Sequence, residues 1–148
     1  MLAAQEATIA AAGPGTTLPT LHALACRKLV EGMLAIGLME GDADEIIESE
    51  GYRNYYMHGT SHWLGLDVHD VGSYTEDGKP RSLEPGMAFT VEPGLYVPQH
   101  NEDAPEAFRG MGVRIEDDLV ITAEGCENLN TAIPKQMADI ESQVGGRP

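Results

Sequence analysis

Residues 87–97 read MAFTVEPGLYV, with a single acidic residue between two apolar runs. Residues 87–91 and 95–97 have the composition of strands, and Glu92-Pro93-Gly94 interrupts them. A carboxylate buried in such a strand costs several kcal/mol or becomes protonated, unless a partner compensates its charge. A metal ion would be such a partner for Glu92. The alternative is that Glu92 caps a turn at Pro93-Gly94.

A second pair of strands is predicted further along the chain. Residues 113–115 and 119–122 have strand composition and flank Glu116-Asp117-Asp118. Arg114 and Glu116 are two residues apart, so on one strand their side chains share a side. Either the two side chains pair with each other or both point to a common site. The Arg-x-Glu pattern is common, and it matters here because another isolated glutamate and a histidine cluster occur in the same chain.

Helical segments surround these strands. Alanine-rich residues 1–12 predict a helix that ends at Gly13-Pro14-Gly15. An apolar stripe predicts a second helix over residues 18–37, with Pro19 harmless in its first turn. We also expect a short acidic helix at 42–52, a polar loop at 98–109 and a helical tail at 134–143. Helices first and strands later predict an α+β fold with a largely antiparallel sheet.

Residues 58–72 read HGTSHWLGLDVHDVG and hold three of the five histidines. Histidine is the commonest metal ligand in proteins and the usual proton carrier near neutral pH. His58 and His62 have the spacing of the helical HExxH zinc motif, but its glutamate is missing and Gly59 disfavours a helix. An extended, glycine-punctuated segment with His62 and His69 at its ends fits better. The alternative is that one or two of these histidines, His58 in particular, are hydrogen-bonded structural residues.

One histidine and two carboxylates form a mixed nitrogen and oxygen ligand set. Such a set suits Mn²⁺, Co²⁺, Fe²⁺ or Zn²⁺ better than a thiolate-bound structural zinc. Carboxylates can also bridge two ions, and paired ions hold a hydroxide nucleophile for hydrolysis. The pattern therefore predicts a metal site.

Composition excludes several classes of function. The chain has 148 residues and a net charge of −15, with nine Lys and Arg, so it offers no basic patch for nucleic acid. Cys26 and Cys126 match no CxxC spacing, which favours a reducing, cytoplasmic setting. The alanine-rich start lacks the basic region of a secretory signal, and no apolar run is long enough to cross a bilayer. We expect a soluble protein without membrane contact.

Four segments together resemble aminopeptidase P (Xaa-Pro aminopeptidase), a family of pita-bread metallopeptidases. They are residues 58–72, Leu83-Glu-Pro-Gly-Met, Val91-Glu-Pro-Gly-Leu-Tyr and Val113-Arg-Ile-Glu-Asp-Asp. The resemblance covers most of the chain and implies a partial pita-bread fold, a curved and mainly antiparallel sheet with flanking helices. It also implies release of an N-terminal residue that precedes proline, by attack of a metal-bound hydroxide on the peptide. The partner would be a proline-containing peptide.

The resemblance also assigns individual roles. It implies a site for two ions, usually Mn²⁺ with Zn²⁺ or Co²⁺ as alternatives, in which His62, Glu92 and Glu116 are ligands and Glu116 bridges the ions. Glu92 would also orient the attacking hydroxide. His58 and His69 would contact substrate and stabilise the tetrahedral intermediate, and Arg114 would support the site by hydrogen bonding and charge.

The chain departs from the family at one point. The family's other two metal ligands are aspartates that precede the first helix, whereas the only aspartates before His58 are Asp42 and Asp44, in the acidic stretch. We therefore expect residues 1–148 to be the C-terminal part of a pita-bread catalytic domain, without the N-terminal domain and the first part of the catalytic domain. Such a fragment would be weakly active or inactive, and its exposed sheet surface favours a homo-oligomer. Two alternatives are prolidase, which cleaves Xaa-Pro dipeptides, and a non-catalytic metal-binding or oligomerising module.

Overall fold

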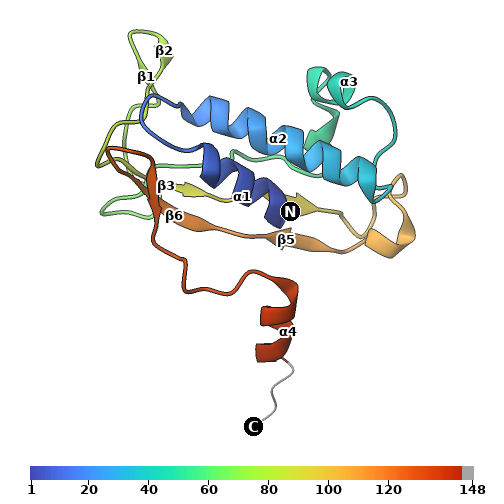
Figure 1. The fold of residues 1–148 in the computed structure, drawn as a ribbon. Coiled ribbons are helices and arrows are strands. Elements are labelled where there is room, and N and C mark those ends of the chain that lie inside the picture. Colours follow the sequence, from blue (N-terminus) through green and yellow to red (C-terminus); the bar gives the residue numbers. More distant parts are fainter. Residues whose placement is uncertain (145–148) are drawn as a thin grey trace.

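A long, interrupted β-hairpin with two helices on one face forms the centre of the molecule (Figure 1). The computed structural model describes residues 1–144. Its helices are α1 (Leu2–Ala11), α2 (Leu18–Ala35), α3 (Ala43–Glu48) and α4 (Met137–Val144), with 3₁₀ turns η1 (Gly51–Asn54) and η2 (Glu106–Phe108). Its strands are β1 (Thr75–Glu76), β2 (Lys79–Pro80), β3 (Ala88–Val91), β4 (Gly94–Tyr96), β5 (Gly112–Arg114), β6 (Asp117–Ile121) and β7 (Cys126–Asn128).

The two arms of the hairpin are each broken at the same level. β3 pairs antiparallel with β6 as far as Val91↔Asp117, and β4 pairs antiparallel with β5 from Gly94↔Arg114. Residues 92–93 therefore face residues 115–116 across a gap in the ladder. Proline has no N–H to donate, so Pro93 cannot continue the ladder. Glu92 and Glu116 both fall within this gap.

Helices α1 and α2 cover one face of the sheet and close its core (Figure 1). The Thr17 side chain accepts a hydrogen bond from the Thr20 N–H at the start of α2, which satisfies one of the free donors of the first turn. Leu21, near that end, packs in one apolar cluster with Trp63 and Phe89. The other end of α2 packs in a second cluster, with Tyr52, Tyr56 and Val97 among its members.

The histidine segment follows the outer edge of β3 without forming a strand of its own. Three backbone hydrogen bonds join the segment to this edge: Leu64 N–H to Ala88 O, Thr90 N–H to His62 O and Glu92 N–H to Thr60 O. After Trp63 the chain turns back on itself, and the Asp70 N–H donates to the Trp63 carbonyl at 3.0 Å. The segment pairs with β3 as far as residue 64, whereas residues 65–69 form an exposed bend. The expectation of an extended segment from His62 to His69 is therefore wrong beyond residue 64.

The fold class is α+β, as the sequence predicts, and the sheets are antiparallel and open. Three of the four predicted helices and the four predicted strands occur, with ends shifted by at most three residues. The expected helix at 42–52 is wrong in detail: it divides into α3 and η1 around Glu50, which has a left-handed φ of 54°. The short strands β1, β2 and β7 were missed. In residues 1–144 no helix is both long enough and apolar enough to cross a membrane.

Candidate metal centre

The gap in the hairpin places two carboxylates beside the histidine segment. Glu92 leaves the first arm just after β3, and Glu116 leaves the second arm just before β6. Because neither residue lies within a paired strand, their side chains are free to turn toward the same point. Glu92 Oε1 lies 3.5 Å and Glu116 Oε1 lies 3.7 Å from His62 Nε2.

His62 is held with one ring nitrogen directed at the carboxylates. Its backbone N–H donates to Thr90 Oγ1 at 3.2 Å, and its carbonyl accepts from the Thr90 N–H at 3.0 Å. Its Nδ1 lies 3.0 Å from the Trp63 carbonyl. A carbonyl only accepts, so Nδ1 carries the hydrogen and Nε2 of the neutral ring keeps a free lone pair. This tautomer is the one that a metal ligand requires.

These three residues fit a divalent cation. One ligand atom from each of His62, Glu92 and Glu116 can be chosen so that all lie within 4.8 Å of one another. Ligands each about 2.0–2.2 Å from a common ion are roughly 3–3.5 Å apart, close to the separations from His62 Nε2. The side chains of His62 and Glu92 are each 14% exposed, and that of Glu116 is 38% exposed. Two adjacent carboxylates with one neutral imidazole need added positive charge, which a cation provides.

Arg114 lies at the open edge of this cluster. Its Nη1 is 3.8 Å from Glu92 Oε2, and its side chain is 53% exposed. Of the two arrangements left open by the sequence, Arg114 and Glu116 thus turn to a common site. An ion pair this exposed contributes little to stability, typically less than about 1 kcal/mol. What Arg114 provides is a positive charge beside the Glu92 carboxylate.

His58 lies beside the cluster and outside it. Its Nδ1–H donates to the Gly59 carbonyl at 2.7 Å, and its Nε2 lies 2.9 Å from the Tyr96 hydroxyl. Gly94 makes this contact feasible: an added Cβ there would lie 2.6 Å from Tyr96 ring carbons. Tyr96 is not among the site residues that the sequence predicts, although it lies two residues beyond the Pro93-Gly94 pair.

His69 approaches the cluster from the exposed bend. Its ring meets that of His62 edge-on, with centroids 4.4 Å apart. His58, His62, His69, Glu92 and Arg114 all line one open cavity of about 390 Å³. The structure thus brings together every site residue that the sequence predicts, with Glu116 adjoining through His62.

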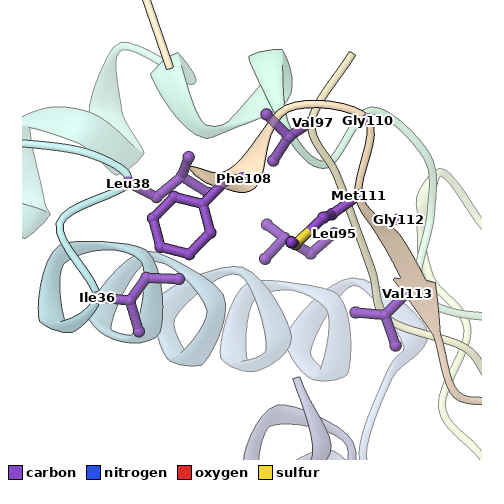
Figure 2. A pocket seen from close by; sticks show the side chains of 9 residues that line it. All are labelled: Ile36, Leu38, Leu95, Val97, Phe108, Gly110, Met111, Gly112 and Val113. Carbon is purple, nitrogen blue, oxygen red and sulfur yellow. The ribbon is translucent and has the colours of Figure 1, made fainter. Parts of the chain in front are cut away.

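A larger cavity lies elsewhere and has a different character. It measures about 470 Å³ and is lined by apolar residues at the far end of β4 and β5, among them Leu38, Leu95 and Phe108 (Figure 2). Figure 2 shows apolar side chains directed into it, and no titratable group lines it. The groups that could bind a metal or transfer a proton therefore lie in the smaller cavity.

Comparison with known proteins identifies the family of the chain. Residues 1–123 match the model of metallopeptidase family M24. The chain is 47% identical over 142 residues to the Xaa-Pro aminopeptidase of Haemophilus influenzae, covering 96% of this chain and 33% of that protein.

Solved structures agree with the sequence comparison. The chain superposes on the aminopeptidase PepP of Pseudomonas aeruginosa with a TM-score of 0.95 and 46% identity, over 97% of this chain and 33% of that one. For Escherichia coli aminopeptidase P with the inhibitor Pro-Leu, the TM-score is 0.90 and the identity 47%, over 95% and 32% of the two chains. The chain thus spans about one third of the length of the relatives that it matches.

Proposed function

The chain belongs to metallopeptidase family M24, and from that premise we propose that residues 1–148 are the C-terminal part of the catalytic domain of a metal-dependent aminopeptidase. The proposed reaction releases an N-terminal residue that precedes proline. The single observation that carries the proposal is the convergence of His62, Glu92 and Glu116 at the gap in the hairpin. The relatives named Xaa-Pro aminopeptidase and the Pro-Leu inhibitor of the Escherichia coli enzyme support the choice of substrate class.

His62, Glu92 and Glu116 would hold the metal. A divalent cation supplies Lewis acidity and makes water a stronger nucleophile near neutral pH. We propose Mn²⁺ as the natural ion, with Zn²⁺ and Co²⁺ as substitutes, because the ligand set has one nitrogen and otherwise oxygen. The complete enzyme would hold two ions, and this chain supplies three of the protein ligands.

The remaining residues of the cavity would act on water and substrate. Glu92 Oε2 faces Arg114 while Oε1 faces His62, so this carboxylate can accept a hydrogen bond from water and fix its orientation. His58 and His69 line the same cavity and are placed to contact the peptide. Tyr96 can donate its hydroxyl hydrogen to His58 Nε2, which holds the imidazole in one orientation.

Three further proposals concern the protein as a whole. A homo-oligomer is favoured by β5, whose three residues are all exposed and which has one paired neighbour, β4, among the described residues. A cytoplasmic location is favoured by the two cysteines, both of which are free thiols. Weak or absent activity of this chain alone is expected because its three ligands are fewer than a two-ion site needs.

The test is a titration of the purified chain with Mn²⁺, followed by electron paramagnetic resonance of the free ion. We expect His62→Ala to abolish binding, because it removes the only nitrogen ligand of the cluster. His100→Ala is the matched control, since His100 is exposed and does not line the candidate metal cavity, and it should bind as the wild type does. Absence of binding by the wild type would favour the non-catalytic alternative.

Substrate class needs a separate assay. Hydrolysis of an Xaa-Pro dipeptide and of an Xaa-Pro-Xaa tripeptide by the full-length parent of this chain should be compared, with and without chelator. Preference for the tripeptide supports the aminopeptidase, and cleavage restricted to the dipeptide would make prolidase the correct assignment. Rapid, chelator-sensitive cleavage by the 148-residue chain would contradict the expectation that it is weakly active.

A further inference from the structure

Thr60 is buried between two side chains that come from different parts of the fold. It is 1% exposed, and its hydroxyl oxygen lies 2.7 Å from the Tyr56 hydroxyl and 2.8 Å from His22 Nδ1. His22 belongs to α2, and its other ring nitrogen, Nε2, lies 3.4 Å from Cys26 Sγ one turn further along the helix. We call Tyr56, Thr60, His22 and Cys26 the polar spine. It joins α2 to the loop that leads into His62.

The hydrogen bonds of the polar spine run in one direction. A hydroxyl has one hydrogen to donate, and Tyr56, itself 1% exposed, has Thr60 Oγ1 as its hydrogen-bond partner in residues 1–144. The buried Tyr56 hydroxyl therefore donates to Thr60, because an unpaired buried donor is costly. The Thr60 hydrogen then goes to His22 Nδ1. Since Nδ1 accepts, the neutral imidazole carries its hydrogen on Nε2, toward Cys26.

The electrostatic surroundings of His22 agree with a neutral ring. Burial lowers the pKa of His22, and the Arg53 guanidinium lowers it further. A protonated ring would have a hydrogen on both nitrogens, so Nδ1 would become a donor toward Thr60. Thr60 would then have to reverse, and the Tyr56 hydroxyl would lose its acceptor.

The backbone of Thr60 reaches the candidate metal centre directly. Its carbonyl accepts a hydrogen bond from the Glu92 N–H at 2.7 Å. The next residue after Glu92 is Pro93, which has no N–H, so this is the last backbone bond that β3 donates to the histidine segment. The hydrogen bond to the Thr60 carbonyl thus holds the Glu92 backbone at the point where the strand ladder stops.

We propose that Thr60 and His22 are positioning residues of the candidate metal centre. The polar spine fixes the Thr60 side chain from both sides, and the Thr60 carbonyl then holds the Glu92 backbone beside His62. Neither residue contacts metal or substrate. The inference deepens the proposed function and rests on it for its consequence, since Glu92 matters chemically only if the site holds metal.

The first experiment measures the backbone contact itself. In ¹⁵N-labelled chain, amide hydrogen exchange of Glu92 should become at least tenfold faster in Thr60→Val, which keeps the shape but loses the hydroxyl. Thr60→Ser keeps the hydroxyl and should stay within about twofold of wild type. Thr8→Val is the matched control: Thr8 is fully buried and its hydroxyl bonds to Ala4 O within α1, away from the site. Unchanged Glu92 exchange in Thr60→Val would overturn the proposal.

Mn²⁺ affinity provides the functional readout. Groups that orient metal ligands typically change metal affinity by about 10–100-fold when removed, so Thr60→Val should raise the Mn²⁺ dissociation constant by that range. Thr60→Ser and Thr8→Val should leave it near the wild-type value. An equal loss of affinity in Thr8→Val would mean that general destabilisation is responsible, which would overturn the assignment of a positioning role. If wild type binds no Mn²⁺, the proposed function fails, while Glu92 exchange still tests the polar spine.

A third measurement needs no variant, in case Thr60→Val does not fold. Long-range ¹H–¹⁵N spectra of the imidazoles report which nitrogen of each ring carries hydrogen. His22 should be the Nε2–H tautomer at pH 7.5, with Nδ1 as acceptor. A Nδ1–H tautomer, or a charged ring, would contradict the direction of the polar spine and overturn the proposal.

Discussion

Replacing Lys135 by methionine should destabilise the fold far more than an exposed lysine normally does. Asp117 follows the candidate ligand Glu116 directly and is 1% exposed. Lys135 Nζ lies 2.9 Å from Asp117 Oδ1 and also donates to the Asn130 carbonyl at 2.9 Å. Without Lys135, the buried carboxylate keeps one partner, the Asn128 side-chain amide at 2.7 Å.

The magnitude follows from the burial of each partner. Removing one member of a buried ion pair costs about 3–5 kcal/mol, because the other charge stays buried without its counterion. The Lys135 side chain is 16% exposed and the Asn128 amide still donates a hydrogen bond to Asp117, so we expect a loss at or just below the lower end of that range, about 2–3 kcal/mol. For a domain of this size such a loss lowers the melting temperature by roughly 4–12 °C.

The assay is urea unfolding followed by circular dichroism, in a double-mutant cycle. Lys135→Met, Asp117→Asn and the double variant are compared with wild type. The double variant removes both charges, so it should be more stable than the sum of the two single changes implies, by about 1.5–3 kcal/mol. Strict additivity of the three free-energy changes would refute the reasoning, since it would mean that the two charges do not interact in the folded state.

Three further predictions use other features of the fold. Gly94→Ala should move the Tyr96 ring, because an added Cβ would lie 2.6 Å from its carbons, and the Tyr96 resonances in NMR spectra should shift. Gly32→Ala is the contrasting variant: a Cβ there meets nothing within 4 Å, so the change should stabilise the protein through α2 by about 0.5–1 kcal/mol in urea unfolding. Because burial lowers the pKa of His22, the unfolded chain binds a proton below about pH 6.5 that the folded chain does not. Stability should therefore fall as the pH drops from 7.5 to 5.5, and less steeply in His22→Gln, and equal slopes would contradict this. Mn²⁺ at 100 times its dissociation constant should stabilise the wild type by about 2.7 kcal/mol and His62→Ala not at all, as measured by thermal unfolding.

Much of the fold was accessible from local sequence patterns. The apolar stripe of α2 indicated a helix because it has the helical period, and the apolar runs around Glu92 indicated strands by their composition. The weak points were short elements. β7 is three residues long and β1 and β2 two each, and unlike the three-residue β4 they contain no apolar run, so nothing in their composition indicates a strand. Glu50 adopts a left-handed φ, which cannot be predicted from its residue type.

The sequence predicted which residues form the candidate site, but not how their side chains are arranged in space. Glu92 and Glu116 stood out because acidic residues within apolar strands require an explanation. Thr60 and Tyr96 gave no such signal, since a threonine between glycine and serine and a tyrosine between two apolar residues are ordinary loop and core residues. Their roles depend on which distant side chains meet them: Thr60 is 38 positions from His22, and Tyr96 is 38 positions from His58.

The sequence alone determined the chemical types at the site and the α+β class, because residue identity and local period are written along the chain. It also determined where the strand ladder must stop, since Pro93 has no N–H. Only the tertiary structure decided that residues 92–93 face residues 115–116, because register is set by pairing between segments more than twenty residues apart. The same holds for the ring nitrogen that His62 offers: the contact of Nδ1 with the Trp63 carbonyl fixes it, and a hydrogen-bond direction exists only once both partners have positions in space.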